Sequence, residues 1–313
     1  FQDLFGDSIV EFITKVTAVS SDSCPHQLSL NNDLISLFAQ IVAPVHPITV
    51  QPCAMHAASN SEEAMVQAQP TSVRKFLASI HRLAGNHTGY NDESISDIWV
   101  DVCVQNGVDY PFHHKKGMRW SCDSRNARSA FLGWNLLMEL LGKCEASNKK
   151  AQDLLKLVVN NIDEVRIGLA RVALSWSIIR DFWAKGSKMQ SRLGLSNLLR
   201  NIQQLLIHSS ADDCRINELI RNRLSSEKDL YLWNEYECEL AHLSELKRQD
   251  ASADLKKTVI VTTKKLLDMM GIEGHVEDPD PSIANEMIVS TNVGVERFFS
   301  RGKLLEERFR LEF

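Results

Sequence analysis

Basic side chains gather in two central segments of the chain. Residues 113–128 hold five lysines and arginines against one acid, and residues 165–208 hold seven against one, in a chain whose formal charge is −5. Cations near aromatic rings favour single-stranded nucleic acid, because the charges follow the phosphates while the rings stack on bases. The two segments therefore predict an interface for single-stranded RNA, built from Lys115, Lys116, Arg119, Trp120, Arg125, Lys185, Lys188 and Arg192.

Some of these cations have a structural alternative. Arg166, Arg171 and Arg180 fall on or beside an apolar stretch that predicts a buried helix. On such a helix they would pair with acids from the rest of the chain and would not face a ligand. The run 185–194, which has a glycine near each end, predicts a loop that could close on phosphate.

The sequence carries no common catalytic or metal motif. It lacks the glycine-rich phosphate loops, the G-x-S-x-G elbow, the H-E-x-x-H zinc helix and the EF-hand loop. Two cysteine–histidine pairs have ligand-like spacing, Cys53 with His56 and Cys238 with His242, but they are far apart in the sequence. A structural zinc site takes four soft ligands, normally as two paired knuckles. We therefore expect no catalytic residue, no metal and no cofactor.

Both ends of the chain predict amphipathic helices set off by proline-bearing linkers. Apolar residues recur at three- and four-residue steps over 1–16, and residues 295–313 follow the acidic run 275–282 with its two prolines. An arm with an apolar face must bury it on its own core, on a second copy or on another protein. The partner-binding residues expected in the C-terminal arm are Phe298, Phe299, Leu304, Leu305 and Phe309.

The elements that must position these residues are helices. None of the eight prolines lies between 112 and 278, and proline breaks helix interiors. Residues 94–105 fit either a helix or a strand. The expected fold is mainly α, an irregular helical bundle with an amphipathic helical arm at each end. Apolar periodicity predicts helices over 30–42, 71–83, 129–142, 151–161, 163–184, 196–208, 214–224, 227–248 and 252–270.

Proline and small-residue runs predict the domain boundaries. We expect an N-terminal helical arm over 1–43 and a proline-bearing linker over 44–70, the latter with room for one short helix. A central helical bundle over 71–278 and a C-terminal linker with a helical tail over 279–313 follow.

Composition bounds the class of protein. The chain is 44% hydrophobic and 24% charged, which excludes a disordered or collagen-like chain. No run approaches the ~18 apolar residues that span a bilayer, so we expect no membrane partner. Seven scattered cysteines without a C-x-x-C pair predict free thiols and an intracellular location, in the cytoplasm or nucleus. Because the first residue is Phe1 and not Met, we expect a trimmed or processed piece of a longer chain.

Three functions follow from these patterns. The first is a non-enzymatic α-helical assembly or adaptor protein, whose helical faces and arms bind a protein partner or a second copy. The second is an oligomerising protein that binds single-stranded RNA. A helical core with a basic centre and two exchanging arms is what an RNA-coating nucleoprotein needs, although this is an architectural analogy. The third is an enzyme with an unrecognised site around His113, His114 and Asp123.

Overall fold

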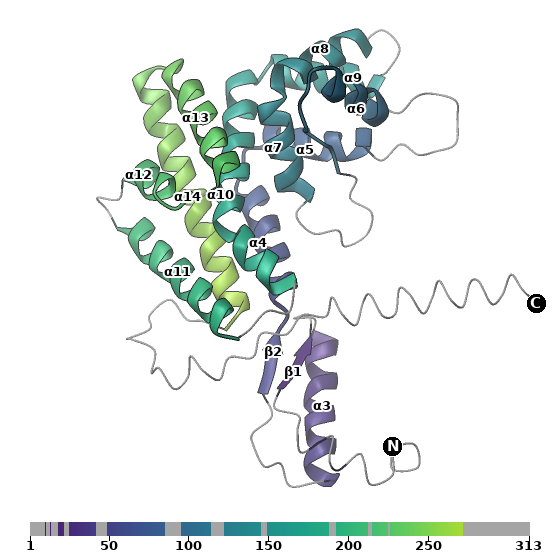
Figure 1. Ribbon diagram of the computed structural model, residues 1–313, viewed down its shortest axis with the longest axis vertical. Coiled ribbons are helices and arrows are strands. Elements are labelled where there is room, and N and C mark those ends of the chain that lie inside the picture. Colours follow the sequence, from purple (N-terminus) through teal and green to yellow (C-terminus); the bar gives the residue numbers. More distant parts are fainter. Residues whose placement is uncertain are drawn as a thin grey trace, which may run out of the picture. The chain divides into compact units, whose positions relative to one another are not determined.

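The computed structural model describes residues 10, 13, 18–21, 25–41, 49–84, 95–113, 122–144, 149–187, 192–211, 215–224 and 226–271. Helices dominate these residues, which confirms a mainly α fold (Figure 1). The chain divides into two compact units. Residues 59–180 and 204–265 form one, called the helical unit here. Residues 1–58, 181–203 and 266–313 form the other, called the strand-bearing unit.

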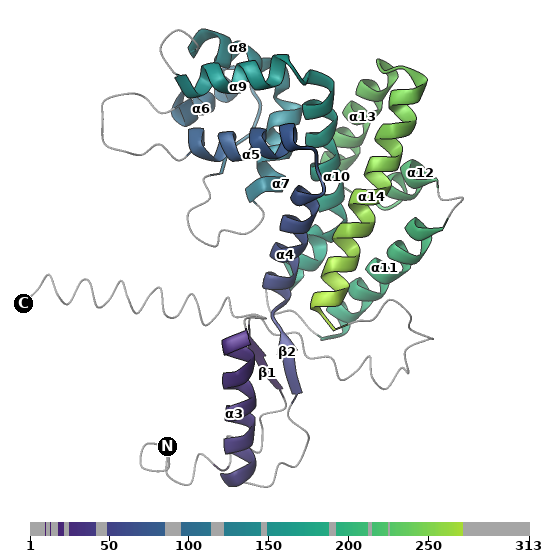
Figure 2. The same ribbon diagram turned by 180° about the vertical axis from the view of Figure 1, so that it is seen from behind.

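The first part of the helical unit is a cluster of short helices that lie together in both views (Figures 1 and 2). Helix α5 contacts α6, α7 and α9, and α8 contacts the same three neighbours. Helix α5 is amphipathic, because Val73, Phe76, Leu77 and Ile80 repeat at helical spacing and are all buried. The members are α5 (Thr71–Ala84), α6 (Ile95–Gln105), α7 (Cys122–Leu132), α8 (Trp134–Cys144) and α9 (Lys149–Val159).

The second part of the helical unit is built on long helices. Residues 167–176 of α10 are all buried, as expected of a helix that is apolar nearly all round. Gly168 lets α10 approach α5 closely, since a Cβ at this position would clash with Val73. The helices are α10 (Ile162–Ser187) up to Arg180, α12 (Ile216–Arg221), α13 (Glu227–Ala241) and α14 (Glu245–Met269) up to Lys265. Helix α11 (Arg192–Ser210) is divided between the two units after Gln203.

Two predicted helices have other boundaries in the structure. The range 129–142 is divided between α7 and α8 at Gly133, where a Cβ would lie 2.8 Å from the Trp99 ring. The small residue gives the indole ring room at this position. The second break falls at 242–244, between α13 and α14, and so lies earlier than the end of the predicted helix 227–248.

In the strand-bearing unit, strands β1 (Ala18–Ser21) and β2 (Thr49–Pro52) pair in parallel, with Ala18 opposite Thr49. Helix α3 (Pro25–Ile41) contacts both strands and begins at a proline, which the first helical turn accepts. A small core joins Ile13 and Phe38, and Leu34 and Ile41 pack against it. The strands are the one element type that periodicity did not predict.

The range 44–70 differs from the expected linker. It contains β2 and the helix α4 (Ala54–Gln67), in which Ala57, Ser61 and Met65 are buried. Its prolines are compatible with this structure, because Pro52 ends β2 and Pro70 precedes α5. Most of residues 1–16 and all of residues 279–313 lie outside the described residues, so both arms stay predictions.

Candidate functional site

A pocket of about 510 Å³ opens in the helical unit beside α7. Its walls are residues 107–113, called the pocket segment here, one face of α7, and the beginning of α13. This volume is within the range of roughly 300–1,000 Å³ that small-ligand sites occupy. The polar groups that line it include Asp109, Tyr110, Arg125, Glu227, Lys228 and Tyr231.

The end of α6 directs the chain into the pocket. Gly107 has a φ of +67°, the left-handed conformation that closes a helix. Its N–H donates to the Val104 carbonyl at 3.1 Å, and the Val108 N–H donates to the Cys103 carbonyl at 3.0 Å. These are the two hydrogen bonds of a Schellman motif, which ends α6 at this glycine.

Side chains from two helices hold the backbone of the pocket segment. Trp99 of α6 donates its indole N–H to the Tyr110 carbonyl at 2.5 Å. Ser129 of α7 donates its hydroxyl to the Pro111 carbonyl at 2.8 Å. Backbone groups outside helices and strands need such partners, because an unpaired buried carbonyl is costly. The segment is therefore fixed in place without regular secondary structure.

Asn126 of α7 fixes the far end of the segment. Its side-chain oxygen accepts the His113 N–H at 2.7 Å, and its amide donates to the His113 carbonyl at 2.9 Å. Asn126 is fully buried, so this paired contact is shielded from competing water. His113, the last described residue of the pocket segment, is thus anchored to α7.

His81 of α5 ties the same region together. Its Nε2 lies 2.6 Å from Asp123 Oδ1, while its Nδ1 lies 3.1 Å from Asn126 Nδ2 and 3.2 Å from the His113 carbonyl oxygen. Both ring nitrogens are therefore engaged by groups of α7 and of the pocket segment. A general base needs a nitrogen that can reach the substrate, so the arrangement is that of a structural clamp.

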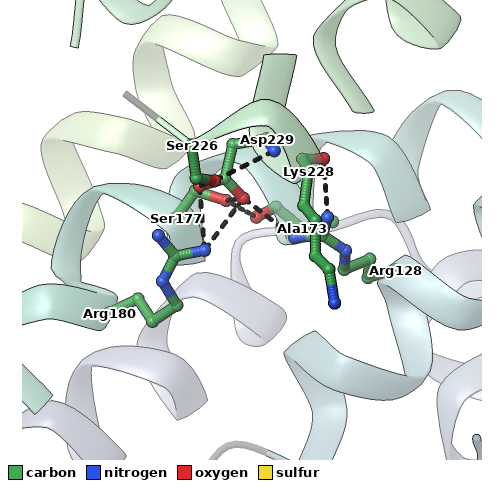
Figure 3. Close-up of polar contacts among 7 residues, drawn as sticks. All are labelled: Arg128, Ala173, Ser177, Arg180, Ser226, Lys228 and Asp229. Carbon is green, nitrogen blue, oxygen red and sulfur yellow. Dashed lines mark hydrogen bonds and ion pairs between the residues drawn. The ribbon is translucent and has the colours of Figure 1, made fainter. Parts of the chain in front are cut away.

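Asp229 joins three helices, and two residues of its network, Arg128 and Lys228, line the pocket (Figure 3). Its carboxylate accepts hydrogen bonds from Arg128 of α7 at 2.8 Å, from Arg180 of α10 at 2.9 Å, and from the Ser177 hydroxyl at 3.1 Å. Figure 3 shows the two guanidinium groups reaching it from opposite sides. Ser226 caps α13 by accepting the Asp229 N–H, and its hydroxyl donates back to the carboxylate.

These partners keep Asp229 ionised. The residue is 1% exposed, and a buried carboxylate is costly unless it is paired. Burial alone raises the pKa of Asp229, but the Ser226 hydroxyl and the two guanidinium groups together hold that pKa below its ordinary value of 3.8. Arg128 also donates to the Lys228 carbonyl at 2.6 Å. Its guanidinium is therefore committed to joining α7 to α13.

The groups that face the pocket combine charge with aromatic surface. Arg125 and Lys228 are exposed, and Figure 3 shows the Lys228 side chain extending away from Asp229. Tyr231 is 48% exposed. Burial and the neighbouring Tyr231, to which it is hydrogen-bonded, raise the pKa of Tyr110. The Tyr110 phenol is therefore neutral at physiological pH, and the rings of Tyr110 and Tyr231 both line the pocket.

The structure places only part of the predicted interface. Arg125 lines the pocket. Lys185 and Arg192 belong to α10 and α11, so both ends of the predicted loop 185–194 are helical, and the side chains of these two residues are not among those described. The predicted residues outside the described ranges are Lys115, Lys116, Arg119, Trp120 and Lys188, together with Phe298, Phe299, Leu304, Leu305 and Phe309.

The structural alternative for the other arginines is confirmed. Arg166 pairs with Glu239 at 2.7 Å, Arg180 with Asp229 at 2.8 Å, and Arg171 with Asp254. These cations of the second basic segment are thus engaged within the helical unit.

The proposed enzyme site is assembled differently from the expectation. Asp123 contacts His81, a residue that the sequence patterns did not single out, and His114 lies outside the described residues. Among the described residues, no group of three or more histidine, cysteine or acidic side chains could hold a metal ion. The sequence patterns also missed three residues that line the pocket. Tyr110 carries no motif, and Lys228 and Tyr231 lie far from the basic segments in the sequence.

No helix in the described part of the chain is both long and apolar enough to cross a membrane. Comparisons with protein-family models, with curated proteins and with solved structures found no match to this chain. The pocket beside α7 is therefore interpreted from its own geometry.

Proposed function

We propose that the chain binds single-stranded nucleic acid without catalysis, and that the pocket beside α7 is its binding site. One observation carries the proposal. Two exposed cations, Arg125 and Lys228, and two tyrosines, Tyr110 and Tyr231, line the same pocket. Cations that track phosphates beside rings that stack on bases are the combination that single-strand binding requires.

The sequence around the pocket adds charge to this site. Residues 114–121 join His113 to Cys122, and Lys115, Lys116 and Arg119 each lie within three residues of one of these two ends. Asn126 and His81 hold the His113 end of that run against α7 and α5. Three further cations are therefore close in sequence to the pocket-lining residue His113 or to the beginning of α7, which supports a phosphate-binding role.

The first test is binding of a fluorescently labelled single strand, followed by anisotropy at several salt concentrations. The double substitution Arg125→Ala with Lys228→Ala should weaken binding at low salt. It should also flatten the log–log salt dependence by about 1.4 units, because each phosphate contact to a single strand contributes about 0.7. Substitution Tyr231→Ala should instead weaken binding by roughly 1–3 kcal/mol with the slope unchanged, since stacking on a base releases no counterion.

The matched control is Lys156→Ala with Arg221→Ala, two exposed cations of the helical unit that do not line the pocket. These changes should leave the salt slope close to that of the unmodified chain. Equal affinity of the pocket variant, the control and the unmodified chain would contradict the proposed site.

A further inference from the structure

Two carboxylates share the pocket with the cations. Asp109 belongs to the pocket segment and Glu227 is the first residue of α13, and both line the cavity. Both are exposed, and neither carboxylate makes a hydrogen bond or ion pair within the part of the chain that the structure describes. Their lone pairs are therefore available to a molecule that enters the pocket.

Carboxylates are unfavourable in a pocket that binds only phosphate. Like charges repel, so each acid weakens the attraction of Arg125 and Lys228 for a polyanion. An ionised carboxylate repays this cost only if the ligand brings a donor to it, because it can accept hydrogen bonds but cannot donate them. The donors of a nucleotide are the hydroxyls of its sugar, the amino groups of some bases and the ring N–H groups of uracil, thymine and guanine.

The positions of the lining groups favour the sugar. Glu227 and Lys228 are consecutive in the first turn of α13, and Asp109 and Tyr110 are consecutive in the pocket segment. The wall formed by α13 therefore offers a carboxylate next to a cation suited to a phosphate. The wall formed by the pocket segment offers a carboxylate next to an aromatic ring suited to a base. In a nucleotide, the sugar is the part that joins the phosphate to the base, and the ribose 2′-hydroxyl is what distinguishes RNA from DNA.

We infer that the pocket takes a ribonucleotide and that Asp109 and Glu227 select RNA over DNA by accepting a hydrogen bond from the ribose 2′-hydroxyl. The inference rests on the proposed function, because it requires nucleic acid to occupy the pocket. It assigns these two residues to sugar specificity, while affinity comes from the cations and the tyrosines.

The test compares three oligomers of about 12 nucleotides, within the range of site sizes known for single-strand binding folds. They are oligouridylate, its deoxyribose counterpart with the same base, and its 2′-O-methyl form. All three carry the same base, so any preference between them must come from the sugar. Each is titrated by anisotropy against the full chain and against the variant Asp109→Ala with Glu227→Ala.

The unmodified chain should bind oligouridylate about tenfold more tightly than the deoxyribose oligomer, the factor of one hydrogen bond to an ionised acceptor. The 2′-O-methyl oligomer, which has no hydroxyl to donate, should bind like the deoxyribose one. In the double variant the ratio should fall to about one. Its affinity for the deoxyribose oligomer should rise, because two like charges have been removed.

The control variant is Asp153→Ala, which removes an exposed carboxylate of α9 that does not line the pocket. It should keep the tenfold ratio. Equal binding of the ribose and deoxyribose oligomers by the unmodified chain would overturn the sugar inference and leave nucleic-acid binding standing. A preference that survives in the double variant would also overturn it. Failure to bind any oligomer would overturn the proposed function and this inference together.

Discussion

Asp229 is the residue whose removal should cost the helical unit most among its polar groups. The substitution Asp229→Asn keeps the shape but leaves Arg128 and Arg180 without their shared carboxylate. We expect a loss of roughly 2–4 kcal/mol in the free energy of unfolding. That is less than for a fully buried pair, because the two arginines stay a quarter to a third exposed. Urea denaturation measures it, with Asp153→Asn as an exposed control that should change stability by less than about 0.5 kcal/mol.

The same residue sets a pH dependence. The folded pKa of Asp229 lies below its ordinary value of 3.8, so its contribution to stability is fully present above that value. It is lost as the pH falls through the folded pKa. The difference in unfolding free energy between the unmodified chain and Asp229→Asn should therefore be constant from about pH 7 to pH 5 and shrink below about pH 4. A difference that grows on acidification would contradict the assigned ion pairs.

The residue types in the sequence predicted the pocket and the ion pairs of Asp229 only in part, for a physical reason. An aspartate in the first turn of a helix is expected to face water and the positive end of the helix, and only the three-dimensional packing brings Arg128 and Arg180 to Asp229. Arg125 was identified because its segment is basic. Lys228 and Tyr231 were not, because their local charge is balanced and the pocket is formed by residues about a hundred positions apart.

At the scale of elements, the pocket segment should depend on Asn126. The change Asn126→Ala leaves the N–H and carbonyl of His113 without their side-chain partner. Unpaired polar groups cost about 1–3 kcal/mol when they stay buried, so the segment should open to water to satisfy them. Hydrogen–deuterium exchange of residues 108–113 should become about tenfold faster or more. Exchange in α9, to which Asn126 makes none of its side-chain hydrogen bonds, should stay unchanged, and equal acceleration in both would indicate general destabilisation instead.

Helices were predictable because their apolar residues repeat with a period that burial on one side imposes. Helix α5 and the buried centre of α10 confirm this. The period does not reveal where a helix divides, because Gly133 breaks the predicted helix 129–142 through its contact with Trp99, a residue from another element. Strands β1 and β2 have four residues each, too few for alternation to be read, and their parallel pairing joins distant parts of the chain.

At the scale of the whole molecule, assembly is the function that the two arms predict. Removing residues 279–313 deletes the apolar set that includes Phe298, Leu304 and Phe309. If these residues bind a second copy, light scattering should give a larger mass for the full chain than for the truncated chain at equal concentration. The far-ultraviolet circular dichroism spectrum should remain helical, because the described helices end at Met269.

Titration of both chains with the oligouridylate probe then separates assembly from binding. The pocket lies wholly in the helical unit, so the truncated chain should keep its affinity for a short strand and lose only cooperative binding to a long one. Equal masses, or equal cooperativity on long strands, would contradict a role of the tail in assembly.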